Sequence, residues 1–173
     1  MVSIIIASNI LKAQPLKTEK VKMEILIDNQ HPNPDIVIEK VKAKAKAILN
    51  ALECPDGELS IVIVDDKTIK KYNQRYLNRN GPTNVIAFPM QEGEFSHINS
   101  EILGDVMISL DTCQREAQLA NLALERRFDE LLIHGILHLF GYDHVDSEER
   151  ALAMEQKSFE LLSIIKALQI EPD

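Results

Sequence analysis

The chain has 173 residues, of which 45% are hydrophobic, and a formal net charge of −8. This length suits a single domain with a real core, and Gly and Pro are too few for a flexible linker. The net charge argues against indiscriminate nucleic-acid binding, and two distant cysteines argue against a disulfide framework or a C-x-x-C metal site. We therefore expect a protein of the reducing cytoplasm.

The first 22 residues differ from the rest of the chain. They contain "MVSIIIASNIL", an apolar run that is too short to span a bilayer and that no positive charge precedes, so neither a membrane anchor nor export is expected. Met23 opens "MEILIDNQ", which reads like the start of a first strand. We expect residues 1–22 to be an N-terminal extension, either disordered or upstream of the true start, and residues 23–173 to form one domain.

Four segments are short, rich in β-branched residues and bounded by turn signals, which is typical of β-strands. They are residues 24–29, 59–64, 84–88 and 102–110. Gly104, inside the last segment, predicts a β-bulge.

Five further segments have apolar residues at helical spacing. They begin after Asp35, at Asp65 or Asp66, and at about residues 111, 126 and 147. The second runs to about Leu77, and Gly141 separates the last two. Asp35 and Asp146 are the predicted N-caps of the first and last helices. Because strands and helices mix without strict alternation, we expect an α+β fold with one small mixed sheet of about four strands and about five helices.

The stretch "HGILHLFGYDH", residues 134–144, contains three of the five histidines. His134 and His138 are four residues apart, so on a helix they lie on one side, one turn apart. Apolar neighbours place this helix in the core. Gly141 favours the left-handed conformation that ends a helix, and a reversal there would bring His144 back to the pair. The spacing predicts one zinc ion on a core helix, held by three imidazoles, with a fourth position open for water.

Other interpretations of the histidines remain open. A single buried histidine is most simply bonded to a backbone carbonyl, but three at chelating spacing favour a metal. The spacing H-x-x-x-H-x-x-G-x-x-H is also that of the metzincin proteases, although Gly135 stands where those proteases carry their catalytic glutamate. A metzincin-like protease is therefore one alternative, and a ribosome-assembly factor whose zinc is only structural is another.

Taken in full, "HGILHLFGYDH" resembles the signature H-G-x-L-H-L-x-G-Y-D-H of the bacterial YbeY endoribonuclease (rRNA maturation factor) family. Two further stretches agree with that family. "GPTNVIAFP" (81–89) resembles its P-T-[DN]-V-L-S-F-P segment, and "LGDVMIS" (103–109) resembles its L-G-D-I-x-I strand. The resemblance runs from about Met23 to about Ile165.

The resemblance implies an α+β fold and one zinc ion held by His134, His138 and His144. It also implies zinc-dependent cutting of single-stranded RNA in 16S rRNA 3′-end maturation and late ribosome quality control, with rRNA and ribosomal particles as partners. The family places an arginine five residues before the proline of its P-T-[DN] segment. This chain has Leu77 there, flanked by Arg75 and Arg79.

A basic stripe precedes the family-like segment. Lys67, Lys71, Arg75 and Arg79 are four residues apart and share one helix face if the helix extends that far. Spacing alone favours a solvated face, but the neighbouring motif favours an RNA backbone as the ligand. Residues 1–86 carry 13 Lys/Arg against 10 Asp/Glu, whereas the remainder carries 6 against 17. An anionic partner would therefore meet the first half of the chain.

We expect a water on the zinc to ionise near pH ~7 and to attack a phosphodiester, with Arg75 or Arg79 helping to stabilise the added charge. Three neutral ligands leave the ion its full charge, so such a water needs little help from a protein base. Asp143 and Glu101 are the candidates if a side-chain base exists. Asp143 has the alternative role of orienting a histidine.

Overall fold

The computed structural model describes residues 24–32, 36–90, 102–143 and 147–168. Residues 1–22, predicted to be an extension, lie outside them. The elements are β1 (Ile25–Asn29), α1 (Ile38–Ala51), β2 (Glu58–Val64), α2 (Asp66–Leu77), β3 (Val85–Pro89), β4 (Ile102–Ser109), α3 (Leu110–Leu119), α4 (Leu124–Leu139) and α5 (Glu148–Ala167). The predicted α+β class, with four strands and five helices in the described part of the chain, is confirmed.

The four strands form one mixed sheet in the order β1-β2-β4-β3. β1, β2 and β4 are parallel, whereas β3 runs antiparallel to β4 and forms an edge of the sheet. The predicted bulge is present in β4: Glu58 pairs with Ile102 but Leu59 pairs with Gly104, so Leu103 is the extra residue. Gly104 has φ +134°, a conformation that L side chains rarely adopt.

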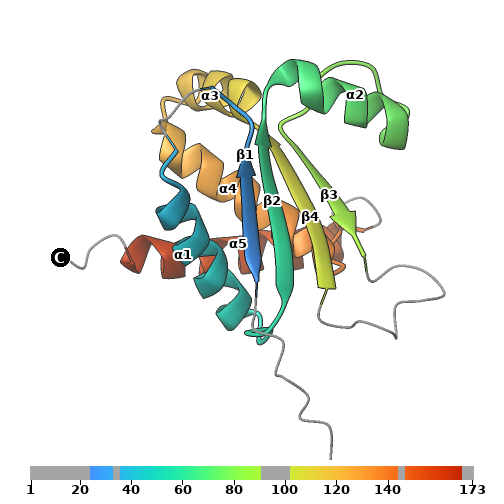
Figure 1. Ribbon diagram of the computed structural model, residues 1–173. Helices are drawn as coiled ribbons and strands as arrows, with labels where there is room; N and C mark the ends of the chain where they lie inside the picture. The colour runs from blue at the N-terminus through green and yellow to red at the C-terminus, as the bar shows by residue number, and fades with distance from the viewer. Residues whose placement is uncertain (1–23, 33–35, 91–101, 144–146, 169–173) are drawn as a thin grey trace, which may run out of the picture.

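The two faces of the sheet are covered very differently. Successive residues of a strand point to opposite faces, so Val85 and Ala87 pack against the main core, while Ile86 and Phe88 pack on the other side. The main core is built by α1, α4 and α5 on one face, and α4 and α5 cross behind the sheet in Figure 1. On the opposite face, Ile69 of α2 packs against Ile86. The edge strand β3 therefore lies between α4 and α2.

Three N-caps can be compared with the predictions. Asp65 caps α2 as predicted, because its side chain accepts a hydrogen bond from the Thr68 backbone N–H at 2.8 Å. The predictions of Asp35 and Asp146 are wrong: α1 begins after Val37 and α5 begins after Ser147. The Ser147 hydroxyl accepts from the Arg150 N–H, so it supplies the acceptor that was assigned to the preceding aspartate.

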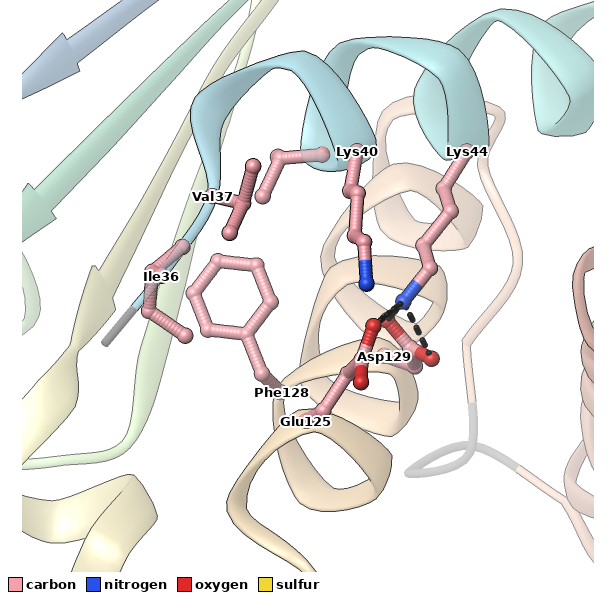
Figure 2. A pocket seen from close by; sticks show the side chains of 8 residues that line it. Ile36, Val37, Lys40, Lys44, Glu125, Phe128 and Asp129 are labelled. Carbon is pink, nitrogen blue, oxygen red and sulfur yellow. Dashed lines mark hydrogen bonds and ion pairs between the residues drawn. The ribbon is translucent and has the colours of Figure 1, made fainter. Parts of the chain in front are cut away.

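A buried ion pair fixes α1 against α4. The Lys44 ammonium lies 2.9 Å from Oδ1 of Asp129 and 2.8 Å from Oε1 of Glu125, beside a cavity of about 110 Å³ (Figure 2). Lys44 and Asp129 are 5% and 4% exposed, whereas the Glu125 side chain is 48% exposed. Burial raises the pKa of Asp129 against the opposing effect of Lys44, and the Lys44 hydrogen bond lowers the pKa of Glu125. Lys44 is therefore paired with one buried carboxylate, whose charge burial disfavours, and with one half-exposed carboxylate.

Cys113, on α3, is a buried free cysteine. Burial raises the pKa of Cys113 to about 12, so this thiol stays protonated. None of the helices in the described ranges is long and apolar enough to cross a bilayer.

Candidate functional site

The two described histidines of the motif face each other on α4. The Nε2 atoms of His134 and His138 are 3.1 Å apart, with ring centroids at 4.6 Å and ring planes at 81°. Both side chains are half-buried, in the C-terminal half of α4, where their neighbours are apolar. Two nitrogens bound to one tetrahedral zinc at about 2.0–2.1 Å lie roughly 3.3 Å apart. The pair thus fits the spacing of a zinc chelate, and a hydrogen bond between two neutral rings fits the same distance.

The chain reverses where the sequence predicted, directly after α4. Gly141 has φ +79°, its N–H donates to the His138 carbonyl at 3.0 Å, and the Tyr142 N–H donates to the Leu137 carbonyl at 3.1 Å. These two bonds form the glycine-dependent helix end known as a Schellman motif. Tyr142 then packs against the main core. The prediction that Gly141 ends the helix is confirmed.

The third predicted ligand, His144, lies outside the described residues, as does the candidate base Glu101. Within the described ranges, no group of three or more His, Cys, Asp or Glu side chains is placed to hold a metal. Asp143 follows the end of α4 and is half-buried. The roles of His144, Glu101 and Asp143 stay predictions.

Gly135 has a packing role that its sequence position did not reveal. A Cβ atom there would lie 2.5 Å from Cγ1 of Val106 and 3.2 Å from Cγ2 of Val85. α4 therefore touches β3 and β4 at this point, with no space for a side chain. A glutamate does not fit at position 135 in this packing, so the glycine sets how closely the histidine helix approaches the sheet.

A cleft of about 500 Å³ opens beside His134, between α4 and α5. Its wall contains a polar network that we did not predict. Arg127 donates to Glu116 at 3.0 Å and to Glu130 at 2.9 Å, and Arg126 donates to Glu130 at 2.8 Å. Asn84 donates to Glu116 at 3.0 Å.

The charges of this network are fixed by their contacts. Burial alone would raise the pKa of Glu130, but the two arginines outweigh it and the pKa is lowered, so the carboxylate stays ionised. Nη1 of Arg126 is buried and has no hydrogen-bond partner in the described part of the chain. In the sequence, Arg126 and Arg127 precede Glu130 by four and three residues. This spacing is that of ordinary surface ion pairs on a helix, so it does not by itself predict a polar network at a site.

The basic stripe ends with α2. Lys67, Lys71 and Arg75 are exposed along α2, but the helix ends at Leu77 and Asn78 adopts the left-handed conformation with φ 53°. The helix thus ends where the sequence predicted, so the condition under which Arg79 would share the face of the stripe is not met. Arg79 is exposed in the following loop, where its N–H donates to the Asn73 carbonyl at 3.3 Å.

The structure does not bring the stripe and the histidines onto one surface. α4 packs on the face of β3 that carries Val85, whereas α2 packs on the face that carries Ile86. The Arg75 guanidinium lies over the Tyr76 ring, 5.4 Å from its centroid, on the α2 side. Leu77, which occupies the position of the family arginine, is 45% exposed.

An aromatic cluster beside the stripe also escaped the sequence analysis. Tyr72 and Tyr76 stack at 6.0 Å between centroids, and Tyr76 meets Phe88 of β3 edge-on at 5.3 Å. The tyrosines are one helical turn apart and alternate with Lys71 and Arg75 in the sequence, which was the only local signal. The contact with Phe88 depends on the folding of β3 beneath α2.

A matching family model and two similar proteins carry the same description. A family model described as Endoribonuclease YbeY matches residues 26–166. A protein named Endoribonuclease YbeY from Syntrophotalea carbinolica is 48% identical over 143 residues, which is 82% of this chain and 95% of the relative. One of the same name from Syntrophus aciditrophicus is 38% identical over 154 residues, 88% of this chain and 96% of the relative. The solution structure of TM1509 from Thermotoga maritima superposes with a TM-score of 0.62 at 25% identity, covering 84% of this chain and 91% of that one.

Proposed function

The chain belongs to the YbeY endoribonuclease family, as its motifs predicted, and on this premise we propose that it is a zinc-dependent endoribonuclease that cuts single-stranded RNA. Its proposed role is 16S rRNA 3′-end maturation and late ribosome quality control in the cytoplasm. The observation that carries the proposal is the pair of imidazole nitrogens 3.1 Å apart beside an open cleft.

The donor set suits zinc. His134 and His138 would hold the ion through Nε2, and the sequence spacing proposes His144 as the third ligand. When bound, zinc would supply Lewis acidity, which lowers the pKa of a coordinated water toward neutrality and stabilises charge on a phosphoryl oxygen. An ion with three neutral ligands keeps its full charge, which is how the chemistry can proceed without a glutamate at position 135.

The chain's own residues supply position and charge. Gly135 seats α4 against β3 and β4, and so fixes the height of the histidines above the sheet. The Schellman turn at Gly141 redirects the chain immediately after His138. Arg126, in the cleft wall, keeps a buried Nη1 donor that no described residue accepts, and an RNA phosphate is a chemically suitable acceptor.

The test uses purified full-length protein. Bound zinc is measured first, and the protein is then incubated with single-stranded RNA and, separately, with an unfolded protein, each with and without a chelator. We expect about one zinc per chain and RNA cleavage that the chelator and His134→Ala both abolish. His31→Ala, which removes a half-buried histidine bonded to Asp111 instead, is the matched control and should retain cleavage.

Each other outcome assigns a different function. RNA cleavage that survives both chelation and His134→Ala would contradict the zinc mechanism. Chelator-sensitive proteolysis without RNA cleavage would favour the metzincin-like alternative. One tightly bound zinc without either activity would favour the ribosome-assembly factor.

A further inference from the structure

We propose that Tyr72, Tyr76 and Phe88 form a stacking platform for the unpaired bases of single-stranded RNA, with Arg75 and the lysines of α2 holding the phosphates. This proposal rests on the proposed function for the identity of its ligand. We call these three rings the aromatic platform. None of them lies on the histidine helix, so the platform is a binding surface separate from the candidate metal centre.

The two tyrosines of the platform are exposed to solvent. Tyr72 and Tyr76 are 37% and 54% exposed, although their rings stack at 6.0 Å with an angle of 18°. Phe88 supports both from β3, edge-on, at 6.3 Å from Tyr72 and 5.3 Å from Tyr76. A pair of near-parallel rings held from below presents a flat π-surface, which is what an unpaired base needs in order to stack.

The cations around the platform are available to a ligand. Lys67, Lys70, Lys71, Arg75 and Arg79 are all exposed, and none forms an ion pair with any residue in the described ranges. By contrast, Arg115, Arg126 and Arg127 on α3 and α4 are each bound to carboxylates. The Arg75 guanidinium lies over the Tyr76 ring, 5.4 Å from its centroid, so one positive charge is in contact with the platform itself.

Charge and ring geometry together favour RNA over a protein as the occupant. The whole chain is acidic, with a net charge of −8, so a basic face on α2 attracts an anionic partner to this surface against the overall charge of the protein. Aromatic rings interleaved with cations are the usual recognition surface for single strands, where phosphates follow the charges and bases stack on the rings. A paired duplex has no free base faces to offer.

The edge strand connects this surface to the histidine side. Val85 and Ala87 of β3 face α4, while Ile86 and Phe88 face α2. β3 is hydrogen-bonded only to β4 within the described sheet, so no further strand lies beyond it. A single strand that stacks on the platform and passes over this edge reaches the helix that carries His134.

The experiment measures binding rather than cleavage. Full-length protein carrying His134→Ala is titrated into a short single-stranded RNA that contains 2-aminopurine, whose fluorescence falls when the base stacks. The double variant Tyr72→Ala/Tyr76→Ala is compared with the conservative double variant Tyr72→Phe/Tyr76→Phe. We expect binding at least about tenfold weaker, with the quenching lost, for the alanine variant, and near-unchanged behaviour for the phenylalanine variant.

The same titration with the strand annealed into a duplex is the second arm. Weak duplex binding should be equal for all three proteins, because only phosphate contacts remain. Unchanged single-strand binding by the alanine variant would overturn the proposal, and so would an equal loss in the phenylalanine variant. Intact RNA binding combined with lost binding to ribosomal proteins would also overturn it and assign the rings to a protein partner. A failed cleavage assay, in contrast, would leave this result unaffected.

Discussion

The two faces of the sheet handle charge in opposite ways. On the α4 face, the charged side chains nearest the histidine helix are paired: Lys44 is buried against Asp129, and Arg127 bridges two glutamates. On the α2 face, the cations are exposed and surround aromatic rings. Pairing neutralises charge and fixes geometry, which suits a helix that must hold two histidines 3.1 Å apart. Unpaired charge leaves the surface open to an anion. We therefore propose that the α4 face carries the catalytic site and that the α2 face binds the RNA strand.

The buried ion pair of the α4 face should have the largest effect on stability. Lys44→Met leaves the Asp129 carboxylate buried without its partner, which should destabilise the fold by about 3–5 kcal/mol. The double variant Lys44→Met/Asp129→Leu removes both charges and should recover most of this loss. Urea unfolding monitored by circular dichroism measures both. Equal destabilisation of the single and double variants would mean that shape, and not charge pairing, holds α1 on α4.

The loss in Lys44→Met should also depend on pH. Burial already raises the pKa of Asp129, and removing Lys44 raises it further. A raised folded-state pKa means that stability is present below the ordinary carboxyl pKa and is lost as the pH rises through the folded value. The deficit should therefore be smaller near pH ~4 than at pH ~7.

Substitution of Gly135, on the side of α4 that faces the sheet, should have the next largest effect on stability. Gly135→Ala places a Cβ against Val106 and should destabilise the fold by about 1–3 kcal/mol, while shifting the histidines. Gly141→Ala is the matched control, since it meets no atom within 4 Å and should cost only about 1 kcal/mol through its left-handed backbone. If the added Cβ weakens the proposed zinc binding by crowding Val106, the double variant Gly135→Ala/Val106→Ala should restore it. A Gly135→Ala variant as stable as the wild type would contradict the close packing described for α4.

On the α2 face, the carboxylate of Asp66 attaches α2 to β4 and α3. Burial would raise the pKa of Asp66, but hydrogen bonds from Ser109 and Thr112, both at 2.6 Å, and the Arg115 ion pair at 2.7 Å outweigh it and lower the pKa. A lowered folded-state pKa gives stability that is present above the unfolded pKa and is lost as the pH falls through the folded value. Asp66→Asn should therefore cost about 1 kcal/mol at pH ~7 and less below pH ~4. A deficit that does not change with pH would argue against the ionised carboxylate as the cause.

The smallest expected effect concerns the free cations of α2. Lys67→Gln/Lys71→Gln should reduce the slope of log affinity for single-stranded RNA against log salt by about 1.4, since each phosphate contact contributes about 0.7. Lys157→Gln/Lys166→Gln removes the same charge from α5 and should leave the slope unchanged. Similar changes in the two variants would show that net charge, and not the α2 surface, attracts the RNA.

Local signals predicted local structure well. The Asp65 cap and the Gly141 helix end depend on hydrogen bonds between residues three to five apart, so the sequence contains everything needed to foresee them. The cap assigned to Asp146 failed because the neighbouring Ser147 supplies the acceptor instead. The first helix begins after Val37 with no side-chain cap, so no local acceptor explains where it starts. The four-residue spacing of His134 and His138 likewise predicted that their rings would meet.

Relations between distant segments could not be foreseen in the same way. The fit of Gly135 against Val106 and the support of Tyr76 by Phe88 both follow from the strand order β1-β2-β4-β3, which places β3 between two helices. No local pattern encodes that order. The end of α2 at Leu77, by contrast, follows from the local segment of residues 78–81, and the left-handed Asn78 there leaves Arg79 outside the helix.

One measurement tests the division between the two faces most directly: single-turnover cleavage of single-stranded RNA as a function of protein concentration, which separates the saturating rate from RNA affinity. His138→Ala should lower the saturating rate by more than about 100-fold with affinity nearly unchanged, since even groups that only orient metal ligands contribute about 10- to 100-fold. Tyr72→Ala/Tyr76→Ala should weaken affinity with the saturating rate nearly unchanged. A loss of affinity in the first variant, or a loss of saturating rate in the second, would contradict the account.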